Sequence, residues 1–73
     1  MEKQKTKKLL SSREHEVLQL LAQEKTTSEI AKILLISFGT VESHRKNIRE
    51  KLQAKNMAGV IVRAIQQGEL EIL

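Results

Sequence analysis

Four residues of helix-capping type divide this chain into short segments, and this punctuation constrains the fold more than any other feature. Ser11 and Thr26 each stand three residues before a Glu, which is the capping-box pattern. Ser37 and Asn56 are further N-cap residues, and Gly68 is placed to close the last helix. The pattern predicts helices over residues 12–23, 27–34, 38–52 and 57–67.

Apolar residues recur at helical spacing in each segment, and no segment alternates as a strand would. We therefore expect an all-α fold, a small four-helix bundle. Only about three residues separate the second predicted helix from the third. So tight a connection forces a steep crossing, which is the helix-turn-helix arrangement.

The chain has 73 residues, enough for one domain with a modest core. Residues 1–9, with four Lys, are predicted to form a flexible basic leader to a domain over residues 10–73. The sequence has no Cys, no long apolar run and no signal peptide. We expect a cytoplasmic bacterial protein that is associated with the nucleoid when it is bound to its partner.

Positive charge gathers in one internal segment, residues 40–55, which carries five Lys or Arg and two Glu. A clustered basic face indicates a polyanion partner, while a solvated Lys-rich surface is the alternative. The sequence has no Trp or Tyr and one Phe, whereas single-strand and common RNA-binding modules need aromatic platforms. A protein that binds in the groove of a nucleic-acid duplex needs no aromatic side chains.

The third predicted helix has two different faces. At about 100° per residue the inward face holds Val41, His44, Ile48 and Leu52. The opposite face has no apolar side chain and consists of Gly39, Ser43, Lys46 and Glu50, flanked by Glu42, Asn47 and Arg49. Such a face suits the major groove, where a Lys donates to guanine and a Glu accepts from cytosine. Ser37 and Thr40, at the helix start, suit phosphate contacts.

The stretches "LSSREHEVLQLLA", "SEIAKILLIS", "GTVESHRKNIREKL" and "AIQQGEL" resemble the LuxR/FixJ/GerE-type helix-turn-helix domain of bacterial transcription regulators. The resemblance covers nearly everything from Leu10 to Leu70. It implies a helix-turn-helix DNA-binding motif over about residues 27–46, with the predicted helix over residues 38–52 as the recognition helix in the major groove. The base-facing residues that it implies are Glu42, Ser43 and Lys46, and the DNA-backbone residues are Thr26, Ser37, Thr40, Arg45 and Lys51.

The position of Glu42 is often basic in that family, so the family's preferred DNA sequence does not carry over. The chain resembles the small single-domain regulators of the family. It resembles equally the effector domain of a two-domain response regulator.

The fourth predicted helix has a wider apolar arc than one contact needs. Met57, Val60, Ile61 and Ala64 can face the core. The arc is extended by Ala58, Val62 and Ile65, which we expect at a homodimer interface, as the resemblance also implies. Deeper packing of this helix is the alternative. A two-fold dimer would read inverted half-sites.

No residue cluster indicates catalysis. His15 is predicted to be a surface residue, and His44 lies on the inward side of its helix without an orienting partner. We expect neither an enzyme nor a cofactor, metal ion or small-molecule ligand in this domain. The expected partner is double-stranded DNA, with RNA polymerase as a further candidate. A helical protein adaptor and a sigma-factor-like promoter-recognition domain are the alternative functions.

Overall fold

The computed structural model describes residues 9–71, and this part of the chain holds four helices and no strand. They are α1 Ser12–Ala22, α2 Thr27–Leu34, α3 Phe38–Lys51 and α4 Met57–Gln66. The predicted all-α, four-helix architecture is confirmed. Most of the predicted leader and residues 72–73 lie outside the described residues, so the division at residue 10 stays a prediction.

Each helix begins at the predicted capping residue. The Ser11 hydroxyl accepts a 3.1 Å hydrogen bond from the N–H of Glu14, whose carboxylate accepts the Ser11 N–H at 3.0 Å. Thr26 and Glu29 form the same reciprocal pair at the start of α2. The side chains of Ser37 and Asn56 each accept one bond from the first turn of α3 and α4. These bonds satisfy N–H groups that a helix start leaves unpaired.

Three helices end one residue earlier than predicted, because the last predicted residue is the C-cap in each case: Gln23, Leu52 and Gln67. A C-cap residue is only half within the helix. After α4, Gly68 adopts a positive φ of 76° as predicted. The N–H of Glu69 then bonds back to the carbonyl of Ala64 at 2.8 Å, which closes the helix.

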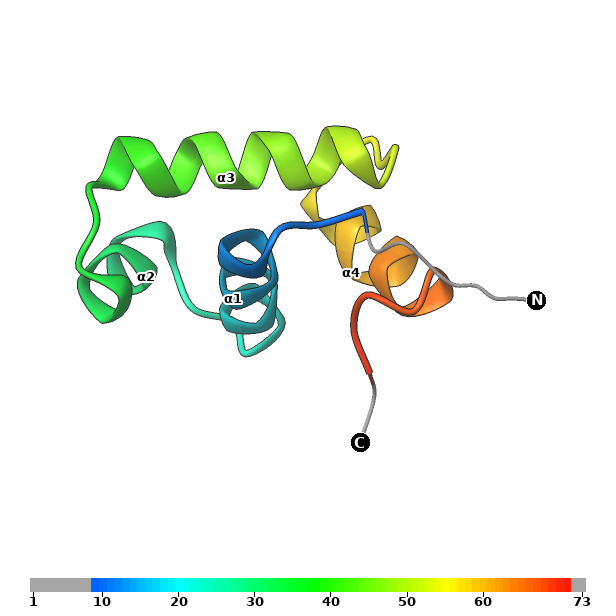
Figure 1. Cartoon of the computed structure of the whole chain (residues 1–73), viewed down its shortest axis with the longest axis horizontal. Coiled ribbons are helices and arrows are strands. Elements are labelled where there is room, and N and C mark those ends of the chain that lie inside the picture. Colours follow the sequence, from blue (N-terminus) through cyan, green and yellow to red (C-terminus); the bar gives the residue numbers. More distant parts are fainter. Residues whose placement is uncertain (1–8, 72–73) are drawn as a thin grey trace.

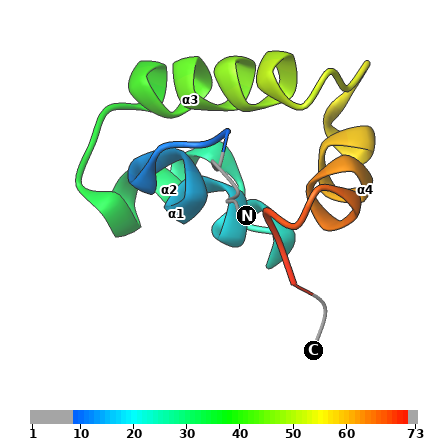
Figure 2. The same cartoon turned by 45° about the vertical axis from the view of Figure 1, so that its right-hand side comes forward.

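Helix α3 organises the molecule, since it contacts each of the other three helices. Figure 1 shows α3 along one side, with α2 below its N-terminal half, α1 below its middle and α4 at its C-terminal end. Figure 2 shows the same arrangement from another direction. One side of α3 is thus covered by three helices, and the other side is left open.

One apolar cluster forms the core between the helices. It consists of Leu10, Val17, Leu18, Ile30, Val41, Ile48, Leu52, Ala54, Val60 and Ala64. Val41, Ile48 and Leu52 come from the predicted inward stripe of α3 and have no exposed surface. His44, predicted on the same stripe, is half-buried.

An ion pair fastens the C-terminal end of α3 to the start of α1. Lys51 Nζ lies 2.8 Å from Glu14 Oε1, and the Glu14 side chain is 7% exposed. Burial alone would raise the pKa of Glu14. The hydrogen bonds from Lys51 and Ser11, together with the positive charge of Lys51, outweigh burial and lower the pKa of this carboxyl.

The prediction that His15 is a surface residue is wrong. Its side chain is only 20% exposed, because the segment after α4 folds over α1 and brings Glu69 Oε1 to 2.8 Å from His15 Nε2. The other oxygen of the buried Glu69 carboxylate accepts the N–H of Leu9 at 2.9 Å. This contact joins the two ends of the described chain to α1.

Candidate nucleic-acid interface

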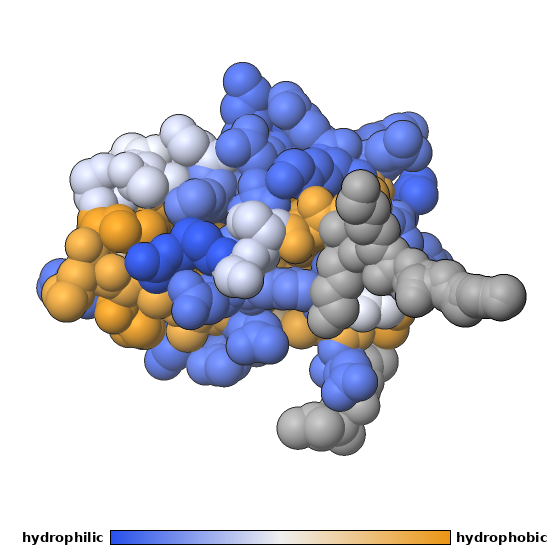
Figure 3. Space-filling model, viewed as in Figure 1, coloured by the Kyte–Doolittle hydropathy of each residue, from blue (hydrophilic) through white to orange (hydrophobic). Residues whose placement is uncertain are grey.

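The open side of α3 is polar from Gly39 onward, whereas Phe38, the first residue of the helix, is 55% exposed. Its exposed residues are Gly39, Thr40, Glu42, Ser43, Lys46, Asn47 and Glu50. In Figure 3 the surface over α3 is hydrophilic, and it is palest over the first half of the helix, where small residues lie. The division of α3 into an apolar inner face and a polar outer face therefore agrees with the sequence pattern.

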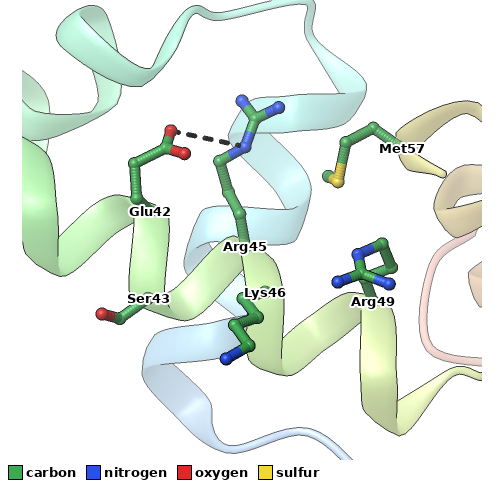
Figure 4. Close-up of a pocket in the computed structure, with 6 residues that line it drawn as sticks. All are labelled: Glu42, Ser43, Arg45, Lys46, Arg49 and Met57. Carbon is green, nitrogen blue, oxygen red and sulfur yellow. Dashed lines mark ion pairs between the residues drawn. The ribbon is translucent and has the colours of Figure 1, made fainter.

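Ser43 and Lys46 lie on this face with their side chains unoccupied. Both are exposed, and within residues 9–71 neither side chain takes part in a hydrogen bond or an ion pair. Figure 4 shows Ser43 and Lys46 extending from α3 without a partner among the residues drawn. A hydroxyl and an ammonium in this state can donate hydrogen bonds to a ligand without breaking a contact of the protein.

Glu42, the third predicted base-facing residue, is held by α2. The hydroxyl of Thr27 donates to Glu42 Oε2 at 2.6 Å, and Arg45 Nη1 donates to the same hydroxyl at 3.1 Å. Arg45 Nε lies 3.8 Å from Glu42 Oε2, the ion pair drawn in Figure 4. Glu42 thus belongs to a cluster of three residues, Thr27, Glu42 and Arg45, that joins the starts of α2 and α3.

Three of the predicted DNA-backbone residues are used at helix starts. Thr26 caps α2 and Ser37 caps α3, while the hydroxyls of Ser37 and Thr40 lie 2.8 Å apart. All three residues are exposed. Helix N-termini present unpaired N–H groups and a partial positive charge, which favour a phosphate.

The other two predicted backbone residues have contacts within the protein. Arg45 is half-buried, because its guanidinium donates to Thr27. Lys51 is the last residue of α3, and its ammonium is paired with Glu14 on the α1 side. The structure does not bring Lys51 together with Ser43 and Lys46, so any contact of Lys51 with DNA would compete with the Glu14 pair.

Arg49 was predicted to flank the outer face of α3 but was not among the predicted DNA-contacting residues. It lines a shallow hollow between α3 and the start of α4, together with Glu42, Ser43, Arg45, Lys46 and Met57. Figure 4 shows these six side chains around the hollow. The signal was present in the sequence, since Arg45 and Arg49 are four residues apart and must share one side of a helix.

The predicted dimer residues lie on the outer side of α4. Ala58 and Val62 are exposed, with Val62 at 55%, and Ile65 is half-buried. Val60 and Ala64 of the same helix are fully buried. The helix therefore presents apolar side chains on both sides, as its wide apolar arc predicts.

Residues 9–71 hold neither a metal-binding cluster nor a membrane-spanning helix. No group of three His, Asp or Glu side chains comes close enough there to hold a metal ion. None of the four described helices has the length and apolar character needed to cross a membrane.

Known proteins are similar to this chain in sequence and in fold. Residues 8–64 match the family described as bacterial regulatory proteins, luxR family. The chain is 46% identical over 67 residues to the spore germination protein GerE of Bacillus subtilis, which covers 92% of this chain and 90% of that protein. It is also 46% identical over 59 residues to an uncharacterised response regulatory protein, YgeK, of Escherichia coli, of which it spans 40%.

Two solved structures have the same fold. A structure of the transcription factor GerE superposes with a TM-score of 0.83 at 35% identity, over 89% of this chain and 97% of that one. A crystal structure of the response regulator ChrA, from a heme-sensing two-component system, superposes with a TM-score of 0.81 at 38% identity. That match covers 90% of this chain and 33% of the other.

Proposed function

Since the chain belongs to the LuxR family of bacterial regulatory proteins, we propose that it reads a specific duplex sequence with α3 in the major groove. Members of this family are DNA-binding transcription regulators and not enzymes. The observation that carries the proposal is the open polar side of α3. It combines exposed small residues, Gly39 and Ser43, with the ammonium of Lys46, which has no partner within residues 9–71. Small residues in the first half of a helix allow its backbone to approach base edges.

The proposed roles follow from chemistry and position. Lys46 donates to guanine O6 and N7, Glu42 accepts from a cytosine amino group, and Ser43 exchanges a hydrogen bond with either base. Thr26, Ser37 and Thr40 contact the DNA backbone at the N-termini of α2 and α3. Arg45, Arg49 and Lys51 add positive charge beside the groove.

A binding titration tests whether the partner is duplex DNA. A labelled mixed-sequence duplex should bind more tightly than its single strands, and affinity should fall steeply with salt because phosphate-bound counterions are released. A protein adaptor, the alternative function, would show no preference for the duplex over its single strands. The family match favours the DNA-binding proposal over that adaptor and over a sigma-factor-like promoter-recognition domain.

The proposed regulator is a homodimer formed through α4. Ala58, Val62 and Ile65 supply an apolar surface whose burial against a second copy would be favourable. A two-fold dimer would place two α3 helices about one turn of DNA apart. RNA polymerase is proposed as a further partner, and the bacterial cytoplasm as the location.

Replacement of Val62 by glutamate should abolish the dimer without unfolding the domain. Each interface would then bury two unpaired carboxylates, whereas in the monomer residue 62 is exposed. Sedimentation equilibrium should give the monomer mass for Val62→Glu and the dimer mass for the unchanged protein. The control is Gln19→Glu, which adds the same charge at an exposed position of α1 and should keep the dimer. Equal masses for Val62→Glu and the unchanged protein would contradict an α4 interface.

A further inference from the structure

The hydroxyl of Thr27 occupies an unusual place between two charged side chains. It donates to Glu42 Oε2 at 2.6 Å and accepts from Arg45 Nη1 at 3.1 Å. A hydroxyl has one proton to donate and lone pairs to accept, so a single oxygen atom can do both at once. Thr27 itself is buried, with 8% exposure. Its hydroxyl is therefore bonded to Glu42 and Arg45 and is shielded from solvent.

Only one oxygen of the Glu42 carboxylate is used in this way. Oε2 meets both Thr27 and Arg45, whereas Oε1 makes no hydrogen bond or ion pair within the described residues. The Glu42 side chain is 50% exposed. One carboxylate oxygen is thus fixed by the protein, and the other is available to a donor from outside.

A carboxylate in a DNA groove must overcome the repulsion of the phosphates. The guanidinium of Arg45, whose Nε lies 3.8 Å from Oε2, offsets that repulsion with a charge of opposite sign. Fixing the rotamer of Glu42 before binding also removes part of the entropy that the contact would otherwise lose. The Thr27 hydroxyl contributes to both effects, because it bonds to the carboxylate and to the guanidinium and so holds them side by side.

Figure 4 shows Glu42 and Arg45 extending to one side of α3, while Ser43 extends to another. Glu42 and Ser43 are therefore directed at different positions of a bound duplex. A free carboxylate oxygen only accepts hydrogen bonds, and the cytosine amino group is the major-groove donor that pairs with it.

We infer that Thr27, on a helix that does not itself read bases, is the positioning residue for Glu42 and makes cytosine the preferred base at one position of each half-site. This inference rests on the proposed reading of duplex DNA by α3. The contacts of Thr27 are to side chains 15 and 18 residues away, so they depend on the crossing of α2 and α3.

Competition binding with matched duplexes tests the inference. Duplex selection with the unchanged protein first defines the half-site, and Glu42→Ala identifies the position at which cytosine preference depends on Glu42. Duplexes with C·G or T·A at that position are then compared. The unchanged protein should prefer C·G about tenfold. Thr27→Val, which keeps the shape and loses the hydroxyl, should lose most of that preference, and Thr27→Ser should retain it.

Three results would overturn the inference while leaving duplex reading intact. They are an unchanged cytosine preference in Thr27→Val, an equal loss of affinity for both duplexes in that variant, and a selected motif with no position sensitive to Glu42→Ala. The second result would mean that Thr27 only supports the packing of α2, which circular dichroism melting of both Thr27 variants would reveal. Selection of no motif by the unchanged protein would contradict the proposed function itself.

Discussion

Lys46→Ala is expected to weaken binding to the selected operator by about 1–3 kcal/mol for each half-site, hence by about 2–6 kcal/mol for a two-fold dimer. The loss follows from the position of Lys46, which is exposed just past the middle of the open side of α3. No contact within residues 9–71 uses its ammonium, so the substitution should leave the fold unchanged. Affinity for the operator and for a scrambled duplex is measured by fluorescence anisotropy at one salt concentration.

The scrambled duplex separates a base contact from a phosphate contact. A base contact by Lys46 predicts a much larger loss on the operator than on the scrambled sequence. Lys55→Ala, in the turn before α4, removes the same charge outside α3 and should affect both duplexes by the same small factor. Equal losses on the two duplexes for Lys46→Ala would place Lys46 on a phosphate.

Ile48→Ala should cost about 2–5 kcal/mol of unfolding free energy. Ile48 lies on the inner face of α3 with no exposed surface, in the cluster that all four helices share. A domain of 73 residues has a total stability of only roughly 4–11 kcal/mol, so this single cavity removes a large part of it. Urea unfolding followed by circular dichroism measures the change. Duplex binding should weaken only as far as the folded fraction falls.

Ile48→Val is the matched control, since it removes one methylene and should cost about 0.5–1.5 kcal/mol. If Ile48→Ala and Ile48→Val were equally stable, the α3 inner face would not carry the core. If Ile48→Ala stayed folded but lost duplex binding, packing on the inner face of α3 would control DNA binding by the outer face. That result would contradict the separation of the two faces.

The helix starts could be predicted from sequence because capping is local. A capping side chain and its N–H partner lie three residues apart, as at Ser11 and Asn56, so the pattern is visible without knowing the fold. The same holds for the two faces of α3, which follow from helical periodicity alone.

Three helix ends carry no glycine signal in the sequence, because residues other than glycine adopt the left-handed conformation there. Glu24, Leu35 and Gln53 have φ values of 66°, 58° and 59°. Only Gly68, the residue type that adopts this conformation without strain, signalled a helix end in the sequence. Leu35 is also 89% exposed, and no local rule would place a leucine there.

Contacts between helices were beyond the sequence pattern. Thr27 and Arg45 are 18 residues apart, Glu14 and Lys51 are 37 apart, and each pair meets only because of how the helices cross. The pattern therefore identified Glu42 and Lys46 on an outer face, but it could not show that Glu42 is held by α2 and Lys46 is not.

Selection from random duplex DNA at near-physiological salt, followed by sequencing of the retained molecules, tests sequence-specific reading by α3 most directly. The account predicts enrichment of an inverted repeat whose half-sites lie about one helical turn apart, and loss of that motif when Lys46 and Ser43 are both replaced by alanine. Retention of all sequences alike by the folded protein would contradict it, because the basic side of α3 would then be only a surface for phosphates.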